Sequence, residues 1–283
     1  MPVYDPDALA PALHTLHEEA PSAVQGYVEE ALDAVAAPTS PGLAGPEAPP
    51  SLSPAAIAER IDHTQLRPAA TDAQIDQVCQ EATTYDFTSV CVHPTFVPRV
   101  VDRLEDTDVT PCTVVGFPHG ANRTATKVQE AERAVMDGAR ELDMVLALGA
   151  LTSGRYADAE ADVRGVVTAA REQGNGIGVH VPVKVILETA LLTPAQTAVA
   201  CVIARRAGAD FVKTSTGFAS AGARAKDVAL MRQVVGPDLG VKASGGVGSV
   251  ADVRRMMAHG ATRIGASGSV AIMEESRAAA ESS

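Results

Sequence analysis

The stretch Phe211-Val212-Lys213-Thr214-Ser215-Thr216-Gly217-Phe218 ends a short β-type run with a lysine and then turns at once. Lysine rarely enters an apolar run without a partner or a chemical role. A partly desolvated ammonium gives up its proton more easily, and the neutral amine is a nucleophile. A second run of this kind is Gly240-Val241-Lys242-Ala243-Ser244-Gly245-Gly246-Val247. The chain has five lysines and 18 arginines, and only lysine can form an imine.

Short apolar runs on both sides of these two stretches alternate with amphipathic segments. The runs predict eight strands: Arg60–Thr64, Ser89–Val92, Thr113–Phe117, Glu141–Leu148, Val181–Leu187, Phe211–Thr214, Gly240–Ala243 and Arg263–Gly265. The amphipathic segments predict helices in a run that starts at Thr71 and in Pro94–Leu104, Thr124–Gly138, Tyr156–Gln173, Thr193–Gly208, Ala225–Val235, Val250–His259 and Val270–Ala280. Eight strand–helix units favour an α/β fold, the closed (β/α)8 TIM barrel. A doubly wound open sheet also alternates, but it usually carries a glycine-rich turn after its first strand, which is absent here.

The N-terminal part of the chain has a different pattern. Residues 1–36 predict a helical extension in which Pro21 separates two short helices, because Leu9, Leu13, Val24 and Val28 fall at helical spacing. Residues 37–52 are rich in proline and glycine and predict a linker, and residues 53–283 form the barrel domain. The extension is either an arm that packs or assists assembly, or a loose tail.

Composition limits the partners of this chain. A net charge of −12 without a basic stripe argues against nucleic-acid binding. No apolar run approaches the ~20 residues that span a bilayer, and we expect no secretory signal. The four cysteines form no CxxC pair, and there is no HExxH motif. We therefore expect a cytoplasmic protein that uses neither a metal ion nor another cofactor.

In a TIM barrel, the active site lies at the C-terminal ends of the strands. The polar residues predicted to meet there are Asp62, His63, Cys91, His93, Asp143, Lys184, Lys213 and Lys242. The last two predicted strands run into Ser244-Gly245-Gly246-Val247 and Gly265-Ala266-Ser267-Gly268-Ser269. Glycines at these positions would let backbone N–H groups approach an anion, so we expect a phosphate site there.

Each of these residues also has a purely structural interpretation. Asp143 could be the partner of a buried lysine, and Lys184 could support Asp143, Asp62 or Glu188. His63 and His93 could hold loops or pack. Cys91 could belong to the core or line a pocket, and Glu188 is expected to pair with a lysine or arginine near the rim. Three lysines and an aspartate directed into one barrel nevertheless favour a chemical role.

That role is imine catalysis. A Lys242 ammonium near Lys213 would disfavour a second positive charge, so Lys213 would lose its proton more readily. Asp143 would keep Lys242 charged and relay protons through a water molecule. The protonated imine on Lys213 would then accept electrons while a carbon–carbon bond breaks or forms.

Seven motifs in order resemble the deoxyribose-phosphate aldolase family over about residues 55–273. They are IDHTQLRP (61–68), SVCVHP (89–94), VGFPHG (115–120), ELDMV (141–145), VKVILET (183–189), FVKTSTGF (211–218) and VKASGGV (241–247). The resemblance implies a class I aldolase that reversibly cleaves 2-deoxy-D-ribose 5-phosphate to acetaldehyde and D-glyceraldehyde 3-phosphate. It also implies small phosphosugars and aldehydes as partners and a homo-oligomer, with a dimer expected.

The motifs carry residue roles with them. The resemblance implies that Lys213 forms the Schiff base, that Lys242 tunes it and that Asp143 completes the proton relay. Residues expected to bind the substrate are Asp62, Cys91, Lys184 and Thr214. Residues expected to bind phosphate are Gly217, Gly245, Gly246, Gly265 and Ser267.

The chain also departs from the family. Phe218 stands where some members carry a lysine, and Gly248 stands where many carry an arginine. The C-terminal tyrosine of some members is missing. Fewer cations at the phosphate end suggest weak discrimination between phosphorylated and free sugars. Two alternative functions stay open: a class I aldolase with a different aldehyde acceptor, and a catalytically silent protein that binds phosphosugars.

Overall fold

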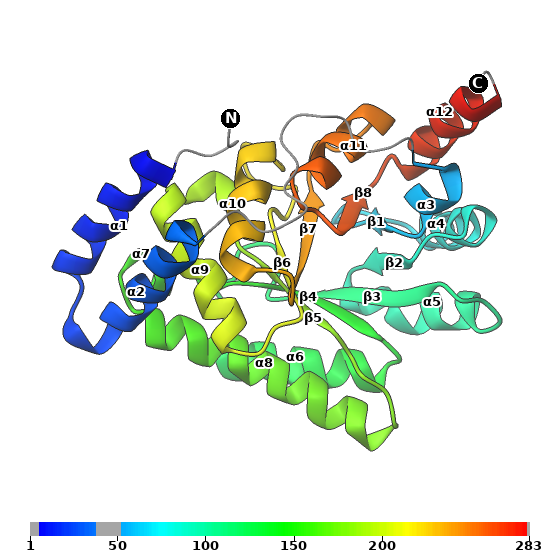
Figure 1. The fold of residues 1–283 in the computed structure, drawn as a ribbon. Coiled ribbons are helices and arrows are strands. Elements are labelled where there is room, and N and C mark those ends of the chain that lie inside the picture. The colour runs from blue at the N-terminus through cyan, green and yellow to red at the C-terminus, as the bar shows by residue number, and fades with distance from the viewer. Residues whose placement is uncertain (1–5, 38–51, 282–283) are drawn as a thin grey trace.

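The computed structural model describes residues 6–37 and 52–281, and its centre is a closed parallel barrel (Figure 1). Its strands follow one another in sequence order from β1 to β8, and β8 closes on β1. The strands are β1 (Ile61–Gln65), β2 (Ser89–Val92), β3 (Thr110–Val115), β4 (Glu141–Val145), β5 (Val183–Ile186), β6 (Phe211–Lys213), β7 (Gly240–Ser244) and β8 (Arg263–Ala266). The predicted (β/α)8 TIM barrel is confirmed.

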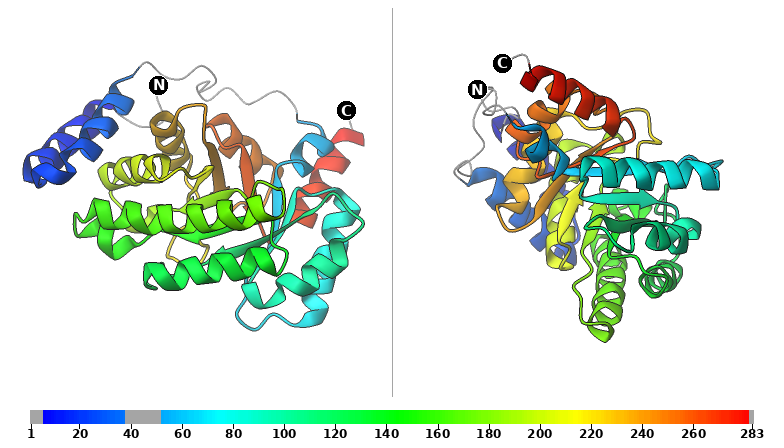
Figure 2. Two further views of the ribbon diagram at one scale, coloured as in Figure 1. Left: turned by 90° about the horizontal axis from the view of Figure 1, so that it is seen from below. Right: turned by 90° about the vertical axis from the view of Figure 1, so that its right-hand side faces the viewer.

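Helices cover the outside of the barrel in the views of Figures 1 and 2. They are α1 (Pro6–Glu19), α2 (Ser22–Ala36), α3 (Pro54–Ala58), α4 (Asp72–Tyr85), α5 (Val97–Leu104), α6 (Thr124–Met136), α7 (Leu148–Thr152), α8 (Tyr156–Gly176), α9 (Pro194–Arg206), α10 (Ala225–Val235), α11 (Val250–Ala258) and α12 (Ser269–Glu281). Two 3₁₀ turns, η1 (Pro94–Phe96) and η2 (Thr189–Leu191), precede α5 and α9. None of the helices in the described part of the chain is long and apolar enough to cross a bilayer.

Local signals explain where two of these helices begin. Thr71 and Gln74 form a capping box at the start of α4, and Thr193 and Gln196 form another at the start of α9. In each case the threonine side chain accepts the N–H of the glutamine, whose side chain accepts the N–H of the threonine. These caps satisfy backbone donors that the first helical turn leaves without partners.

Some predicted boundaries were wrong. The strand predicted for Glu141–Leu148 ends at Val145, and Leu148 begins α7 instead. The apolar run continues across this turn, and apolar runs alone do not distinguish a buried strand from a buried helix. The short helix α3 was missed, although Ser53 caps it by accepting the N–H of Ala56 at 3.2 Å.

The N-terminal helices α1 and α2 form a hairpin that packs on α9, and α2 also contacts α8 and α10. Figure 1 shows this hairpin at the left, next to α9 and α10. Leu13 and Val28 are fully buried in it, which confirms the two helices predicted on either side of Pro21. The predicted linker at 37–52 falls outside the described residues except for its two ends.

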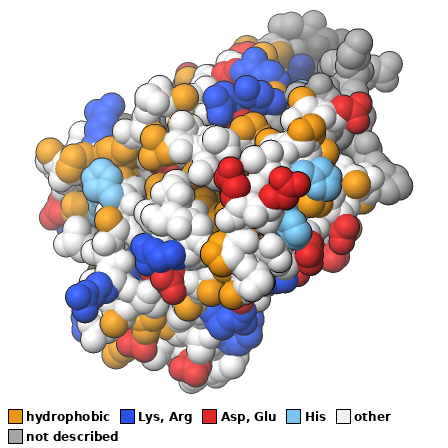
Figure 3. Space-filling view, turned by 90° about the vertical axis from the view of Figure 1, so that its left-hand side faces the viewer, with side chains coloured by type: hydrophobic (Ala, Val, Ile, Leu, Met, Phe, Trp, Pro, Cys, Tyr) orange, Lys and Arg blue, Asp and Glu red, His pale blue; other side chains and the backbone are white. Residues whose placement is uncertain are grey.

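Polar contacts fix the hairpin to the barrel. Glu30 forms ion pairs with Arg205 and Arg206 of α9, and the Arg206 guanidinium lies 4.2 Å from the centre of the Tyr27 ring. The Tyr27 hydroxyl donates to Glu160 of α8 at 2.7 Å. The extension is therefore a packed arm in this structure and not a loose tail. Figure 3 shows its outer face, where hydrophobic and charged side chains are interspersed.

Candidate active site

The site is built from alternate residues of neighbouring strands, because every second side chain of a barrel strand points inward. The strand register places Asp143 of β4 opposite Lys184 of β5, and Lys213 of β6 opposite Lys242 of β7. It also places Asp62 of β1 opposite Gly265 of β8. Polar residues far apart in the sequence are thereby brought together inside the barrel.

Asp143 is fully buried and contacts all three of these lysines. Its Oδ2 atom accepts hydrogen bonds from Lys213 Nζ at 2.6 Å and from Lys242 Nζ at 2.7 Å. Its Oδ1 atom accepts one from Lys184 Nζ at 2.9 Å. The predicted trio of Asp143, Lys213 and Lys242 therefore meets at a single carboxylate oxygen.

Two further carboxylates complete the charged network. Asp62 lies 2.5 Å from Lys242 Nζ and accepts a hydrogen bond from Arg263 at 2.7 Å. Glu141 lies 2.6 Å from Lys184 Nζ and 3.3 Å from Arg263. The sequence did not lead us to assign Glu141 or Arg263 to the site. Each of them is a charged residue at the start of an apolar strand, two residues before one whose position faces the interior, and this pattern could have identified them.

The buried charges set one another's protonation. Burial alone would raise the pKa of Asp143, but the three lysines hold it well below its ordinary value of 3.8. Burial would likewise raise the pKa of Asp62, but Lys242, Lys184 and Arg263 lower it. Burial would lower the pKa values of Lys184 and Lys242, but Asp143 and the other carboxylates raise both above 10.5. These four groups are thus held in their charged forms.

The network contains one more base than acid. Its basic side chains are Lys184, Lys213, Lys242 and Arg263, and its carboxylates are Asp62, Glu141 and Asp143. Lys184 and Lys242 each pair with more than one carboxylate, whereas among residues 6–37 and 52–281 Lys213 pairs only with Asp143. Of the three lysines in this network, Lys213 thus has the fewest carboxylate partners.

A cavity of about 690 Å³ opens above this network. Of the three lysines bonded to Asp143, only Lys213 lines the cavity, and its side chain is 3% exposed. Lys242 and Lys184 are fully buried beneath it. A carbonyl compound entering the cavity would therefore meet the Lys213 amine first.

The five residues expected to bind phosphate, Gly217, Gly245, Gly246, Gly265 and Ser267, all line the same cavity. Gly245 and Gly246 have φ angles of 83° and 75°, which glycine adopts without steric cost. At Gly265, an added Cβ atom would lie 3.0 Å from Lys242 Cε and from Ser244 Cβ, so glycine leaves room for the Lys242 side chain.

The residues expected to bind the substrate lie deeper. Asp62, Cys91, Lys184 and Thr214 are all fully buried, and none of them is among the residues that line the cavity. Asp62 and Lys184 belong to the charged network, and the Thr214 hydroxyl donates to the Ser244 carbonyl at 3.1 Å. In this conformation, these four residues would not touch a ligand in the cavity directly and would act on it through the residues that line the cavity.

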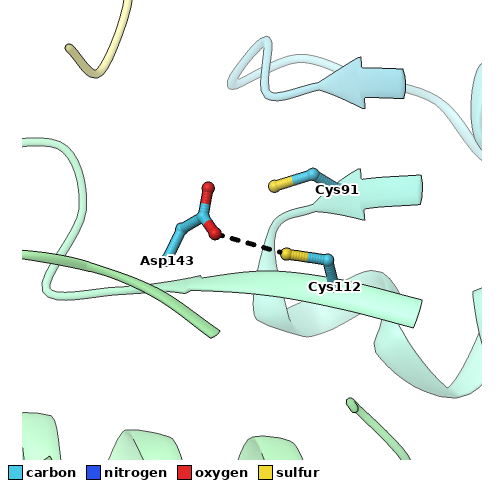
Figure 4. Close-up of side chains that lie close together, drawn as sticks. All are labelled: Cys91, Cys112 and Asp143. Carbon is cyan, nitrogen blue, oxygen red and sulfur yellow. Dashed lines mark hydrogen bonds between the residues drawn. The ribbon is translucent and has the colours of Figure 1, made fainter. Parts of the chain in front are cut away.

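Cys91, Cys112 and Asp143 form a compact buried group (Figure 4). Cys112 Sγ donates to Asp143 Oδ1 at 3.5 Å and accepts from Lys184 Nζ at the same distance. Burial and a side-chain hydrogen bond with Cys91 raise the pKa of Cys112, which keeps Cys112 a thiol. Although these are metal-binding residue types, a divalent cation here would face the lysines that already occupy both Asp143 oxygens.

Other polar residues position the loops around the cavity. Glu188 does not pair with a lysine or arginine in the described structure, contrary to expectation; its carboxylate accepts the N–H of Thr216 at 3.2 Å and the Thr216 hydroxyl. His93 holds the Leu66 carbonyl at 3.0 Å, and His63 bonds to Glu81 at 2.7 Å. His93 thus holds the loop after β1, whereas His63 joins β1 to α4 and packs against Phe87.

Comparison with known proteins gives a consistent result. The DeoC/LacD family aldolase profile matches residues 56–273. The deoxyribose-phosphate aldolase of Macrococcus caseolyticus is 53% identical over 218 residues, which are 77% of this chain and 96% of that protein. The protein of the same name from Caldanaerobacter subterraneus subsp. tengcongensis is 52% identical over 77% of this chain and 93% of its own length.

Two solved structures are similar over a longer part of the chain. A proposed deoxyribose-phosphate aldolase from Coccidioides immitis has a TM-score of 0.77 at 38% identity and covers 98% of this chain and 100% of its own. A deoxyribose phosphate aldolase from Aeropyrum pernix, described as having a unique tetrameric structure, has a TM-score of 0.74 at 32% identity, with coverage of 92% and 100%. Both alignments must include residues before the barrel domain, because residues 53–283 are only about four-fifths of the chain.

Proposed function

The chain belongs to the DeoC/LacD family of aldolases, and we propose that it reversibly cleaves 2-deoxy-D-ribose 5-phosphate to acetaldehyde and D-glyceraldehyde 3-phosphate. Relatives named deoxyribose-phosphate aldolase share about half of their residues with this chain over almost their whole length. The observation that carries the mechanism is the arrangement around Asp143, in which Lys213 alone of the three bonded lysines reaches the cavity.

The proposed reaction begins at Lys213. Its neutral amine adds to the C1 aldehyde carbon of the open-chain sugar, and loss of water leaves a protonated imine. The C3 hydroxyl then loses its proton, and the C2–C3 bond breaks. The electron pair of that bond moves toward the imine nitrogen and leaves an enamine, while D-glyceraldehyde 3-phosphate departs. Protonation of the enamine carbon and addition of water release acetaldehyde and restore the amine.

Asp143 and Lys242 are the proposed proton carriers. Both lysine nitrogens contact the same Asp143 oxygen, so a proton that leaves Lys213 has a short route into the network. The Lys242 ammonium also disfavours a second charge at Lys213. These groups would exchange protons with the substrate through water, in the manner of general acid and base catalysis.

The glycine loops are the proposed phosphate site. Gly245 and Gly246 follow β7, while Gly265 and Ser267 lie at the end of β8, and α12 begins at Ser269. Backbone N–H groups and a helix N-terminus favour an anion at this position. The phosphate would thus lie at the mouth of the barrel, with the aldehyde end of the sugar directed toward Lys213.

We also propose that the protein acts as a homo-oligomer in the cytoplasm. A dimer is expected because barrels of this kind often form dimers, while the Aeropyrum pernix relative is described as tetrameric. All four cysteines are unpaired, as suits a reducing compartment. Light scattering after size-exclusion chromatography would separate dimer, tetramer and monomer.

A coupled assay for D-glyceraldehyde 3-phosphate tests the proposed function. We expect purified protein to release this product from 2-deoxy-D-ribose 5-phosphate, and the Lys213→Arg variant to release none, because arginine keeps its proton. Lys226→Arg is a matched control, since Lys226 is exposed on α10. Binding of the sugar phosphate without turnover by the wild-type protein would favour a silent binding protein instead.

A further inference from the structure

The proposed phosphate end of the cavity is poor in charge. The ends of β7 and β8 and the loops after β6, β7 and β8 contribute Thr216, Gly217, Phe218, Ser244, Gly245, Gly246, Val247, Gly265, Ala266, Ser267 and Gly268 to its lining. None of these side chains carries a charge. A phosphate dianion held there by backbone N–H groups alone would lack a cationic partner.

Arg67, on the loop after β1, is the one arginine among the residues that line this cavity. Strand β1 pairs with β8, and its His63 lies opposite Ala266. Arg67 is four residues beyond His63, and Ser267 and Gly268 directly follow Ala266. The two loops therefore leave neighbouring strands at the same end of the barrel, so Arg67 lies on the side of the cavity next to the β8 loop.

The backbone at Arg67 is held on both sides. Its N–H donates to Gln65 Oε1 at 3.2 Å, and its carbonyl accepts the N–H of Ala70 at 3.0 Å. The preceding Leu66 is 6% exposed and packs with Cys91, Cys112 and Val114 inside the barrel. The loop thus has a fixed position from which the Arg67 side chain extends.

The Arg67 side chain itself is available. It is exposed, and within residues 6–37 and 52–281 no ion pair joins its guanidinium to a carboxylate. Glu81, the carboxylate that also lines the cavity, is bonded to His63 and Gln77 instead. A guanidinium without a carboxylate partner, beside an uncharged glycine-rich rim, matches the geometry and charge of a phosphate group.

We propose that Arg67 binds the phosphate group of the substrate and makes the enzyme prefer phosphorylated sugars to free ones. This inference rests on the proposed aldolase function and adds to it the residue that determines phosphate specificity. Arg67 would face the side of the phosphate opposite to the backbone N–H groups of the glycine loops. The absence of cations at Phe218 and Gly248 suggested weak discrimination between phosphorylated and free sugars. With Arg67 bound to the phosphate, we expect a clear preference for the phosphorylated sugar instead.

The test compares turnover of 2-deoxy-D-ribose 5-phosphate and of 2-deoxy-D-ribose by four proteins: wild type, Arg67→Ala, Arg67→Lys and Arg123→Ala. Arg123 is the matched control, because it is an exposed arginine on the β3–α6 loop and does not line the cavity. We expect Arg67→Ala to raise KM for the phosphosugar about tenfold or more. Its kcat and its turnover of the free sugar should stay at wild-type values, and Arg67→Lys should fall in between.

Inorganic phosphate provides a readout that does not depend on turnover. Calorimetric titration should show weaker phosphate binding to Arg67→Ala than to wild type and Arg123→Ala, and added salt should reduce this difference. Equal binding, or an equal loss of turnover for both sugars, would overturn the proposed role of Arg67. If the wild type cleaves neither sugar, the proposed function is wrong, and the phosphate titration then decides the Arg67 proposal alone.

Discussion

Lys213 and Lys242 occupy opposite positions in neighbouring strands, yet their surroundings differ. Lys242 lies between Asp62 and Asp143 and is fully buried, whereas Lys213 contacts Asp143 alone and borders the cavity. The number of carboxylates around each amine therefore distinguishes the proposed nucleophile from its charged partner. The sequence motifs suggested the same division of roles, but they did not show how many carboxylates surround each lysine.

Removing the Lys242 charge should impair the nucleophile. In Lys242→Met, Asp143 would keep Lys213 but lose the second lysine nitrogen bonded to its Oδ2 atom, so the proposed proton route between the two lysines would be broken. We expect turnover at neutral pH to fall about 100-fold or more. Turnover at the wild-type rate in this variant would contradict the proposed role of Lys242.

The same charges should make stability depend on pH. The pKa values of Asp62 and Asp143 are lowered on folding. Their contribution to the free energy of unfolding is therefore present above about pH 4 and is lost as the pH falls further. The pKa values of Lys184 and Lys242 are raised, so their contribution is present below about pH 10 and is lost as the pH rises beyond it. The free energy of unfolding should therefore be greatest between these limits.

Guanidinium chloride titrations at a series of pH values would measure this dependence. In Asp62→Asn the acid side of the profile should become shallower, because one titrating carboxylate is gone. An unfolding free energy that is unchanged between about pH 2 and pH 4 would show that the buried carboxylates do not contribute as described.

Among the secondary-structure elements, α6, β4 and α8 are joined by a second buried ion pair. Lys127 of α6 is fully buried, and its Nζ donates to Asp162 of α8 at 2.6 Å and to the Val145 carbonyl at the end of β4 at 2.9 Å. The Thr124 hydroxyl donates to the other Asp162 oxygen at 2.9 Å. This pair fixes two helices to the end of the strand that carries Asp143.

We expect Lys127→Met to destabilise the protein by about 3–5 kcal/mol, because Asp162 would remain buried without its cation. The double variant Lys127→Met/Asp162→Leu should recover much of that loss. Urea unfolding of both single variants and the double variant measures the coupling. Lys226→Met, at an exposed position of α10, is the control and should change stability by less than about 0.5 kcal/mol. Additive losses in the double variant would contradict a role for the pair.

The order and type of the barrel elements could be predicted from the sequence, because each buried strand is a short apolar run and each helix is amphipathic. The end of β4 could not, since Leu146-Ala147-Leu148 continues the apolar run while the chain already turns into α7. The trio at Asp143 was predicted from motifs. Glu141 and Arg263 were not assigned to it, because only the strand register shows that they face the same interior.

For the molecule as a whole, the N-terminal hairpin is part of the folded structure. Its buried residues and its ion pairs to α9 could not be predicted from helical periodicity, which shows an apolar stripe but not the surface that the stripe covers. The charged network around Asp143 lies entirely within the barrel. The hairpin should therefore affect stability and assembly more than the chemistry.

A single charge placed in the hairpin tests this role. Val28→Asp puts a carboxylate at a fully buried position of α2, and we expect it to lower the Tm by roughly 5 °C or more. Light scattering would show whether assembly changes with it. Asp33→Ala, at an exposed position of the same helix, is the control. An unchanged Tm in Val28→Asp would mean that the hairpin does not stabilise the barrel.

The central claim, that Lys213 forms the imine, is tested most directly by trapping. The protein is incubated with acetaldehyde, reduced with borohydride and digested, and the ethylated lysine is located by mass spectrometry. We predict an ethyl group on Lys213 that is absent from Lys213→Arg, with exposed Lys226 showing only background labelling. Specific labelling of Lys242 or Lys184 instead, or no enrichment at Lys213 over surface lysines, would contradict the claim.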